Sequence, residues 1–144
     1  MSRTPDTAEI LDQLSQLLRQ LTRLAGGADD PGPALTATQR IALIEIGEAG
    51  PLRLNDLAAR MGASAPTASR AVDTLDELGL VARATDPADR RAVQIELTPA
   101  GRQLVDERKA RVGVAFAPAV AALPAAERQQ LLALLARMTD ALAP

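Results

Sequence analysis

Residues 54–98 read LNDLAARMGASAPTASRAVDTLDELGLVARATDPADRRAVQIELT, and this stretch decides the fold. Apolar residues recur with the period of a helix up to Gly62, and a second helical pattern, capped by Ser64, closes at Gly79. Two short helices joined by a glycine-containing turn predict a helix-turn-helix. The inner face predicted for the second helix consists of Ala68, Ala71, Val72, Leu75 and Leu78.

The apolar period changes to two after this helix. Residues 81–83 lead into a polar stretch at 85–91, and apolar residues then alternate with polar ones up to Leu97. Alternation of this kind predicts strands, and the polar stretch predicts the turn between them. We therefore expect a β-hairpin, or wing, directly after the helix-turn-helix.

Two helices are predicted before the central stretch. Residues 7–25 place leucine and isoleucine at alternating spacings of four and three, an amphipathic pattern with a heptad-like seam. Residues 36–39, TATQ, match a capping box at the start of a helix that ends near Ala49. Its apolar positions predict burial over much of the helix; they are Ile41, Leu43, Ile44 and Ile46.

Two helices are also predicted after the wing. Thr98 and Pro99 suit the start of a long helix to about Val120, which Pro118 would kink or end, and the last helix begins near Pro124. The apolar residues of this last helix again repeat at spacings of four and three. We assign the first and last helices to a dimer interface, with an intramolecular core as the alternative. The interface residues are Ile10, Leu14, Leu17, Leu21, Leu131, Leu135, Met138 and Leu142.

The amino-acid composition excludes several classes of function. The 144 residues contain no cysteine and no histidine, which excludes thiol switches, thiolate metal sites and histidine-based catalysis. We therefore expect no metal, no cofactor and no enzymatic activity. No apolar run approaches the roughly 20 residues of a membrane helix, and the start of the chain lacks a secretion-signal pattern, so a cytoplasmic protein is expected. The net charge of −2 does not by itself point to nucleic acid.

The order of predicted elements resembles that of the MarR family of bacterial transcriptional regulators. The most specific match is in the wing, where Asp89, Arg91, Leu97 and Thr98 fit the family pattern of aspartate, any residue, arginine, five residues and Leu-Thr. The resemblance covers nearly the whole chain and implies a mainly α fold with a small β-wing. It implies one MarR-like domain, 1–144, with a winged helix-turn-helix at 34–98 between dimerisation helices at 7–25 and 98–143.

The resemblance also assigns candidate DNA contacts in the second helix of the helix-turn-helix, the recognition helix. A recognition helix in the major groove presents its first turns to bases and phosphates. Arg70 is expected to reach a guanine edge or a phosphate. The candidates in this helix are Ser64, Ala65, Thr67, Ser69 and Arg70.

Further candidates lie in the wing. Arg91 resembles the family's minor-groove arginine, Asp89 is assigned as its ion-pair partner, and Arg90 is assigned to a phosphate. From charge pattern alone, the alternative is a solvated turn with a surface ion pair of little value.

These observations predict a sequence-specific regulator that binds double-stranded DNA. The resemblance implies a homodimeric, ligand-responsive repressor on a palindromic operator, with a small-molecule effector. The alternative is a winged-helix module that binds proteins and lacks specific DNA binding.

Overall fold

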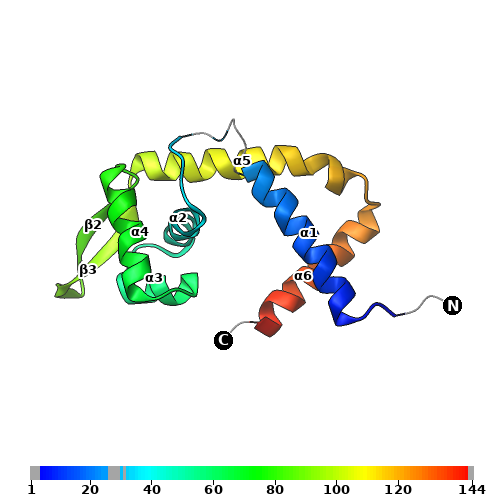
Figure 1. Cartoon of the computed structure of the whole chain (residues 1–144), viewed down its shortest axis with the longest axis horizontal. Coiled ribbons are helices and arrows are strands. Elements are labelled where there is room, and N and C mark those ends of the chain that lie inside the picture. The colour runs from blue at the N-terminus through cyan, green and yellow to red at the C-terminus, as the bar shows by residue number, and fades with distance from the viewer. Residues whose placement is uncertain (1–3, 26–29, 31, 143–144) are drawn as a thin grey trace. The chain divides into compact units, whose positions relative to one another are not determined.

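The computed structural model describes residues 4–25, 30 and 32–142 (Figure 1). Within these residues the fold is mainly helical with a small antiparallel sheet, as predicted. The elements are α1 (Thr7–Ala25), α2 (Ala37–Ala49), β1 (Leu52–Arg53), α3 (Leu54–Met61), α4 (Ala65–Glu77), β2 (Val81–Asp86), β3 (Asp89–Leu97), α5 (Pro99–Ala121) and α6 (Ala125–Leu142). The glycine- and proline-rich stretch at 26–33 predicts a loop, which lies partly outside the described residues. No helix of the described part is long and apolar enough to cross a membrane.

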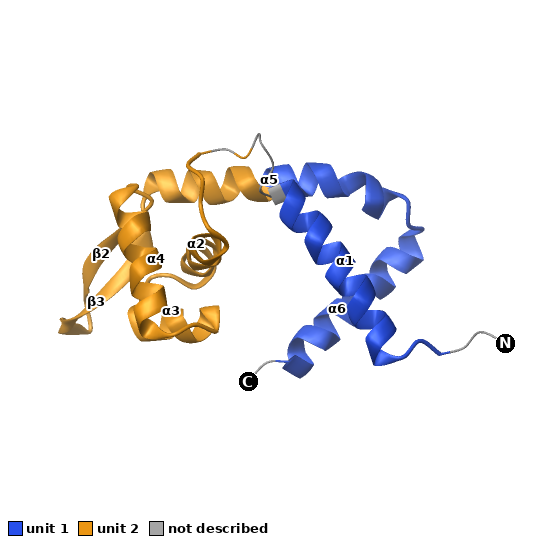
Figure 2. Cartoon of the chain, in the orientation of Figure 1, with its two compact units in different colours: residues 1–26, 110–144 blue, residues 27–109 orange. Residues whose placement is uncertain are grey.

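The chain divides into two compact units (Figure 2). Unit 1 comprises residues 1–26 and 110–144, and unit 2 comprises residues 27–109. Unit 2 therefore contains the helix-turn-helix of α3 and α4 and the wing of β2 and β3. Unit 1 contains α1, the last part of α5, and α6.

The core of unit 2 forms where α2, α3 and α4 meet the sheet. Its largest fully buried side chains are Leu43, Ile46, Leu57, Leu75, Val72 and Val81. The inner face predicted for α4 is confirmed at its four positions from Ala68 to Leu75. The prediction was wrong for Leu78, which is 43% exposed, because the helix ends there and the chain turns at Gly79, whose φ is +70°.

The predicted burial of α2 is correct for one face only. Leu43 and Ile46 are buried, whereas Ile41 and Ile44 are 45% and 49% exposed. These two exposed isoleucines lie one turn apart on the face that is not covered by the core. The sequence prediction was wrong for them because an apolar residue on every side of a helix does not reveal which side is covered.

The predicted helix ends are confirmed. The Thr36 hydroxyl accepts a hydrogen bond from the amide of Gln39 at 3.3 Å, and the Gln39 side chain accepts one from the amide of Thr36 at 2.9 Å. The Ser64 hydroxyl accepts from the amide of Thr67 at 3.3 Å. Gly62 ends α3 in the left-handed conformation, with φ of +62°, which glycine adopts without strain.

The sheet has the strand order β1-β3-β2, with both neighbouring pairs antiparallel. Sequence patterning missed β1, because two residues are too short to show an alternation. The predicted turn at 85–91 was too long, since only Pro87 and Ala88 lie between the two strands of the wing. Polar residues continue along both strands because the end of the hairpin is solvent-exposed on both faces, apart from Asp86.

The start of α5 is joined to the end of the recognition helix. The Thr98 hydroxyl donates to the carbonyl of Gly79 at 2.6 Å and accepts from the amide of Gly101 at 3.1 Å, which confirms its capping role. The amide of Thr98 donates to the carbonyl of Leu80 at 3.1 Å. Pro118 lies inside α5, which continues to Ala121, so this proline does not end the helix.

The helices of unit 1 leave apolar side chains exposed. No described residue of α1 or α6 is buried. Of the predicted interface residues, Leu14 and Leu21 are partly exposed and the remaining six are exposed. The exposed fraction is 44% for Ile10 and 43% for Leu135. Packing within the described residues therefore does not cover the apolar faces of α1 and α6.

Candidate nucleic-acid interface

The first turn of α4 is built around its cap. Ser64 precedes the helix, Ala65 begins it, and the Ser64 and Thr67 hydroxyls lie 2.9 Å apart in a hydrogen bond. Ser69 is partly exposed one half-turn further on. The two capping hydroxyls therefore hold each other at the helix end, and the small side chains leave the backbone open to close approach.

Arg70 is the one basic residue of α4, and its guanidinium makes no hydrogen bond or ion pair within the described residues. It lines a polar groove of about 230 Å³ between α4 and the start of α2. The other lining residues are Thr36, Thr38, Gln39, Thr67, Ala71 and Thr74. Arg70 is thus an exposed cation whose donors are available to a group outside the chain.

The wing is tied to α4 by an arginine that sequence reasoning had treated only as a strand residue. Arg83 of β2 donates from Nη1 to Asp76 at 2.7 Å and from Nη2 to Asp73 at 2.5 Å. The hydrogen bond with Asp73 and the charge of this residue, followed by the hydrogen bond with Asp76 and its charge, raise the pKa of Arg83 above its ordinary value. The two acids lie on the recognition helix, so this contact joins the two elements proposed to meet DNA.

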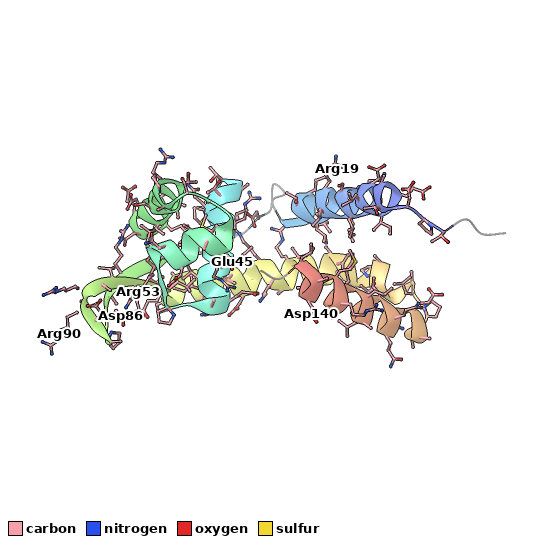
Figure 3. All side chains as sticks on the ribbon, turned by 90° about the horizontal axis from the view of Figure 1, so that it is seen from below. Arg19, Glu45, Arg53, Asp86, Arg90 and Asp140 are labelled. Carbon is pink, nitrogen blue, oxygen red and sulfur yellow. The ribbon has the colours of Figure 1, made fainter. Side chains whose placement is uncertain are left out.

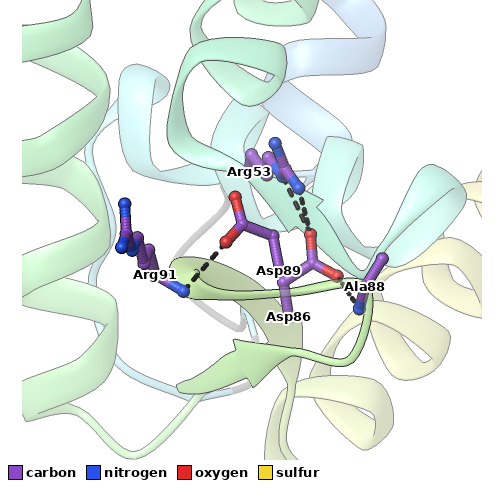
Figure 4. Close-up of polar contacts among 5 residues, drawn as sticks. All are labelled: Arg53, Asp86, Ala88, Asp89 and Arg91. Atoms are coloured by element: carbon purple, nitrogen blue, oxygen red, sulfur yellow. Dashed lines mark hydrogen bonds and ion pairs between the residues drawn. The ribbon is translucent and has the colours of Figure 1, made fainter.

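A second arginine holds the turn of the wing (Figure 4). Asp86 is only 4% exposed; it accepts from Nε of Arg53 at 2.9 Å and from the amide of Ala88 at 2.9 Å. The Ala88 amide first, and then the Arg53 guanidinium, hold the pKa of Asp86 below its ordinary value. Sequence reasoning missed this pair because Arg53 and Asp86 are 33 residues apart.

The predicted ion pair between Asp89 and Arg91 is not present. Asp89 accepts instead from the backbone amide of Arg91, at 3.0 Å (Figure 4). The prediction failed because a short aspartate side chain readily bonds the amide two residues further on. The Arg91 guanidinium is therefore exposed and unpaired within the described part of the chain.

Arg90 gives the same wing a second exposed cation. Its side chain extends outward at the end of the hairpin (Figure 3). Both arginines lie on β3 and not in the turn, because that strand begins at Asp89. The wing thus presents two exposed guanidinium groups on consecutive residues of β3, while its one buried carboxylate, Asp86, is neutralised by Arg53.

Asp86→Asn is expected to loosen the turn of the wing, because the neutral amide loses the charge-assisted bond to Arg53 and accepts more weakly from Ala88. Amide hydrogen exchange at Ala88 should speed up by about fivefold to tenfold. Asp106→Asn on α5, where the carboxylate is exposed and has no partner within the described residues, is the control and should leave exchange in the wing unchanged. Equal exchange in both variants would contradict this role of Asp86.

The same contact gives a pH dependence with a definite sign. Because the pKa of Asp86 is lowered on folding, its contribution to stability is fully present above the unfolded value of about 3.9 and is lost as the pH falls through the folded value. Acid should therefore loosen the wing of the parent protein. The Asp86→Asn variant should lack this part of the response.

Comparison with known proteins supports the architecture. The model of the MarR family matches residues 35–92, which span α2 to the start of β3. A probable transcriptional regulator from Pseudomonas aeruginosa is 35% identical, with a TM-score of 0.60, and the match covers 90% of this chain and 98% of that one.

Two other solved structures are also similar over nearly their whole length. Wild-type MarR from E. coli, in its apo form, shares the fold with a TM-score of 0.72 at 23% identity, and the match covers 94% of this chain and 98% of that one. BpsR from Bordetella bronchiseptica is 27% identical, with a TM-score of 0.68 and 97% of each chain covered. With the family match over the helix-turn-helix, these similarities show that the chain belongs to the MarR family of winged helix-turn-helix transcriptional regulators.

Proposed function

We propose that this chain binds double-stranded DNA in a sequence-specific manner and acts as a homodimeric, ligand-responsive repressor on a palindromic operator. The observation that carries the proposal is the set of exposed, unpaired guanidinium groups on the two elements of unit 2 that would meet a duplex. Arg70 lies on the recognition helix, and Arg90 and Arg91 lie on the wing. In this proposal residues 1–144 act as one MarR-like domain of a cytoplasmic protein with no catalytic role.

In the proposed complex, the first turns of α4 enter the major groove. Arg70 then reaches a guanine edge or a phosphate, and the small residues nearby permit close approach to the bases. The candidates in this helix remain Ser64, Ala65, Thr67, Ser69 and Arg70. On the wing, Arg91 enters the minor groove, where its planar cation gains from the concentrated negative potential, and Arg90 contacts a phosphate.

The proposed dimer uses the exposed apolar faces of α1 and α6. Apolar side chains such as Leu17 and Met138, which are 40% and 41% exposed, gain free energy when a second copy covers them. A two-fold symmetric dimer presents two recognition helices, which matches an operator made of two half-sites.

A small-molecule effector is part of the proposal. DNA binding by the similar protein BpsR is regulated by 6-hydroxynicotinic acid. For this chain we propose an effector of unspecified chemistry that binds better to the conformation that does not bind DNA, as reciprocal linkage requires.

Selection of binding sites from random duplex DNA tests the proposal. We expect enrichment of a palindromic site whose affinity falls steeply as the salt concentration rises, because phosphate contacts release counterions. A chain that enriches no sequence, and whose binding partners are proteins that contact the same surface, would instead be the protein-interaction module.

Arg91→Ala is expected to weaken operator binding by roughly 1–3 kcal/mol, because the wing loses its minor-groove cation. Thermal unfolding should not change, since the side chain is exposed. Arg90→Ala is the matched control: loss of a phosphate contact should weaken binding to all sequences equally, whereas Arg91→Ala should affect sites with a narrow minor groove most. Fluorescence anisotropy with two operators that differ only under the wing measures the difference.

Asp89→Ala tests whether the backbone geometry at the start of β3 positions Arg91. It removes a negative charge near DNA, yet we expect it to weaken binding, because Asp89 holds the backbone amide of Arg91. The double variant with Arg91→Ala should lose less affinity than the two single losses combined, since both act through one contact. Tighter binding by Asp89→Ala would show that this aspartate acts only through its charge.

A further inference from the structure

The recognition helix carries more negative than positive charge. Within α4, Arg70 is the one basic residue, against the acids Asp73, Asp76 and Glu77. A helix in the major groove lies between two rows of phosphates, so bare carboxylates on it oppose binding. Asp73 lies four residues after Ser69, a proposed DNA contact, and hence on the same face of the helix.

One side chain of the wing engages two of these carboxylates. Arg83 donates to Asp76 at 2.7 Å and to Asp73 at 2.5 Å, and the three side chains are between 38% and 55% exposed. Ion pairs at this exposure add little to folding stability. The main effect of the cluster is therefore on the charge of the recognition helix. The guanidinium of Arg83 offsets one of the two negative charges and holds both carboxylates in hydrogen bonds.

We propose that Arg83 masks the carboxylates of Asp73 and Asp76 from the DNA phosphates, and is thereby a positioning residue for the recognition helix. The proposal rests on the proposed DNA-binding function. With Arg83 in place, Arg70 faces the duplex beside paired acids; without it, two bare carboxylates would stand on the helix that enters the groove. Arg83 acts through the two aspartates and need not touch DNA.

Arg83→Ala tests the masking by exposing both acids. Operator affinity should fall by about fivefold to tenfold near 0.1 M salt, and the loss should shrink as salt screens the repulsion. The melting temperature should change little. Arg60→Ala is the matched control, because it breaks an exposed ion pair of 2.7 Å and leaves Glu45 unpaired on α2 and not on the recognition helix. An equal loss of affinity in this control would overturn the proposal.

Removal of the two acids separates masking from other roles of Arg83. When Asp73→Asn and Asp76→Asn are added to Arg83→Ala, the affinity should return to within about twofold of the parent, because nothing remains to be masked. If the triple variant stays as weak as Arg83→Ala, then Arg83 contacts DNA itself or fixes the wing, and the proposal is wrong. The pair Asp73→Asn and Asp76→Asn alone should bind at least as tightly as the parent, and weaker binding would likewise overturn it.

The same titrations distinguish this inference from the proposed function. A parent chain that binds no selected duplex overturns DNA binding and the masking role together. A parent chain that binds, with Arg83→Ala unchanged in affinity at every salt concentration, overturns the masking role alone.

Discussion

Gly101→Ala is expected to lower the free energy of unfolding by about 2–3 kcal/mol, because there is no room for a methyl group at this position. A Cβ there would lie 1.9 Å from the carbonyl oxygen of Leu80 and 2.9 Å from its carbonyl carbon. These are backbone atoms, so they cannot turn aside as a flexible side chain would. The first turn of α5 would have to move away from the end of the recognition helix, with loss of the Thr98 contacts.

Gly113→Ala is the matched control on the same helix. A Cβ at this position meets no atom within 4 Å, so the substitution should be neutral or stabilise the helix by about 0.5–1 kcal/mol. Chemical unfolding followed by circular dichroism measures both variants. Equal stability of the two alanine variants would show that the packing of Gly101 against Leu80 does not limit the fold.

The elements predicted correctly from the sequence are those whose signals are local. The capping box joins Thr36 to Gln39, the Ser64 cap reaches Thr67, and Gly62 acts on the residues directly before it. Each device lies within three or four residues of chain, so its chemistry can be read without knowledge of the fold. The same holds for α1, whose predicted bounds match the structure.

The contacts that sequence reasoning missed are those between distant segments. Arg53 and Asp86 meet only because β1 pairs with β3, which brings residues 33 positions apart together. Arg83 meets Asp73 only because the wing folds back along α4. No spacing rule links such residues, so the charges that tie the wing to its neighbours could not be identified before the fold was known.

Substitution of two exposed apolar residues, one turn apart on α6, tests whether this helix forms the proposed dimer interface. Leu135→Lys together with Met138→Lys is expected to yield a monomer that binds operator DNA at least about a hundredfold more weakly than the parent. The two side chains are 43% and 41% exposed in the isolated chain and lie on one face of a helix that contains no buried residue. A charged ammonium buried there without a partner costs more free energy than the apolar contact it replaces had contributed.

The loss of affinity follows from the symmetry of the proposed complex. Once one protomer is bound, the second meets its half-site at a high effective concentration, and a monomer loses that advantage without losing any contact of its own. Gln130→Lys adds one such positive charge on α6 outside the predicted seam, so this control should remain a dimer with full affinity. Sedimentation combined with DNA titration measures both properties. A dimer that tolerates both lysines would place the interface elsewhere, and a monomer with full affinity would show that DNA binding does not need the second copy.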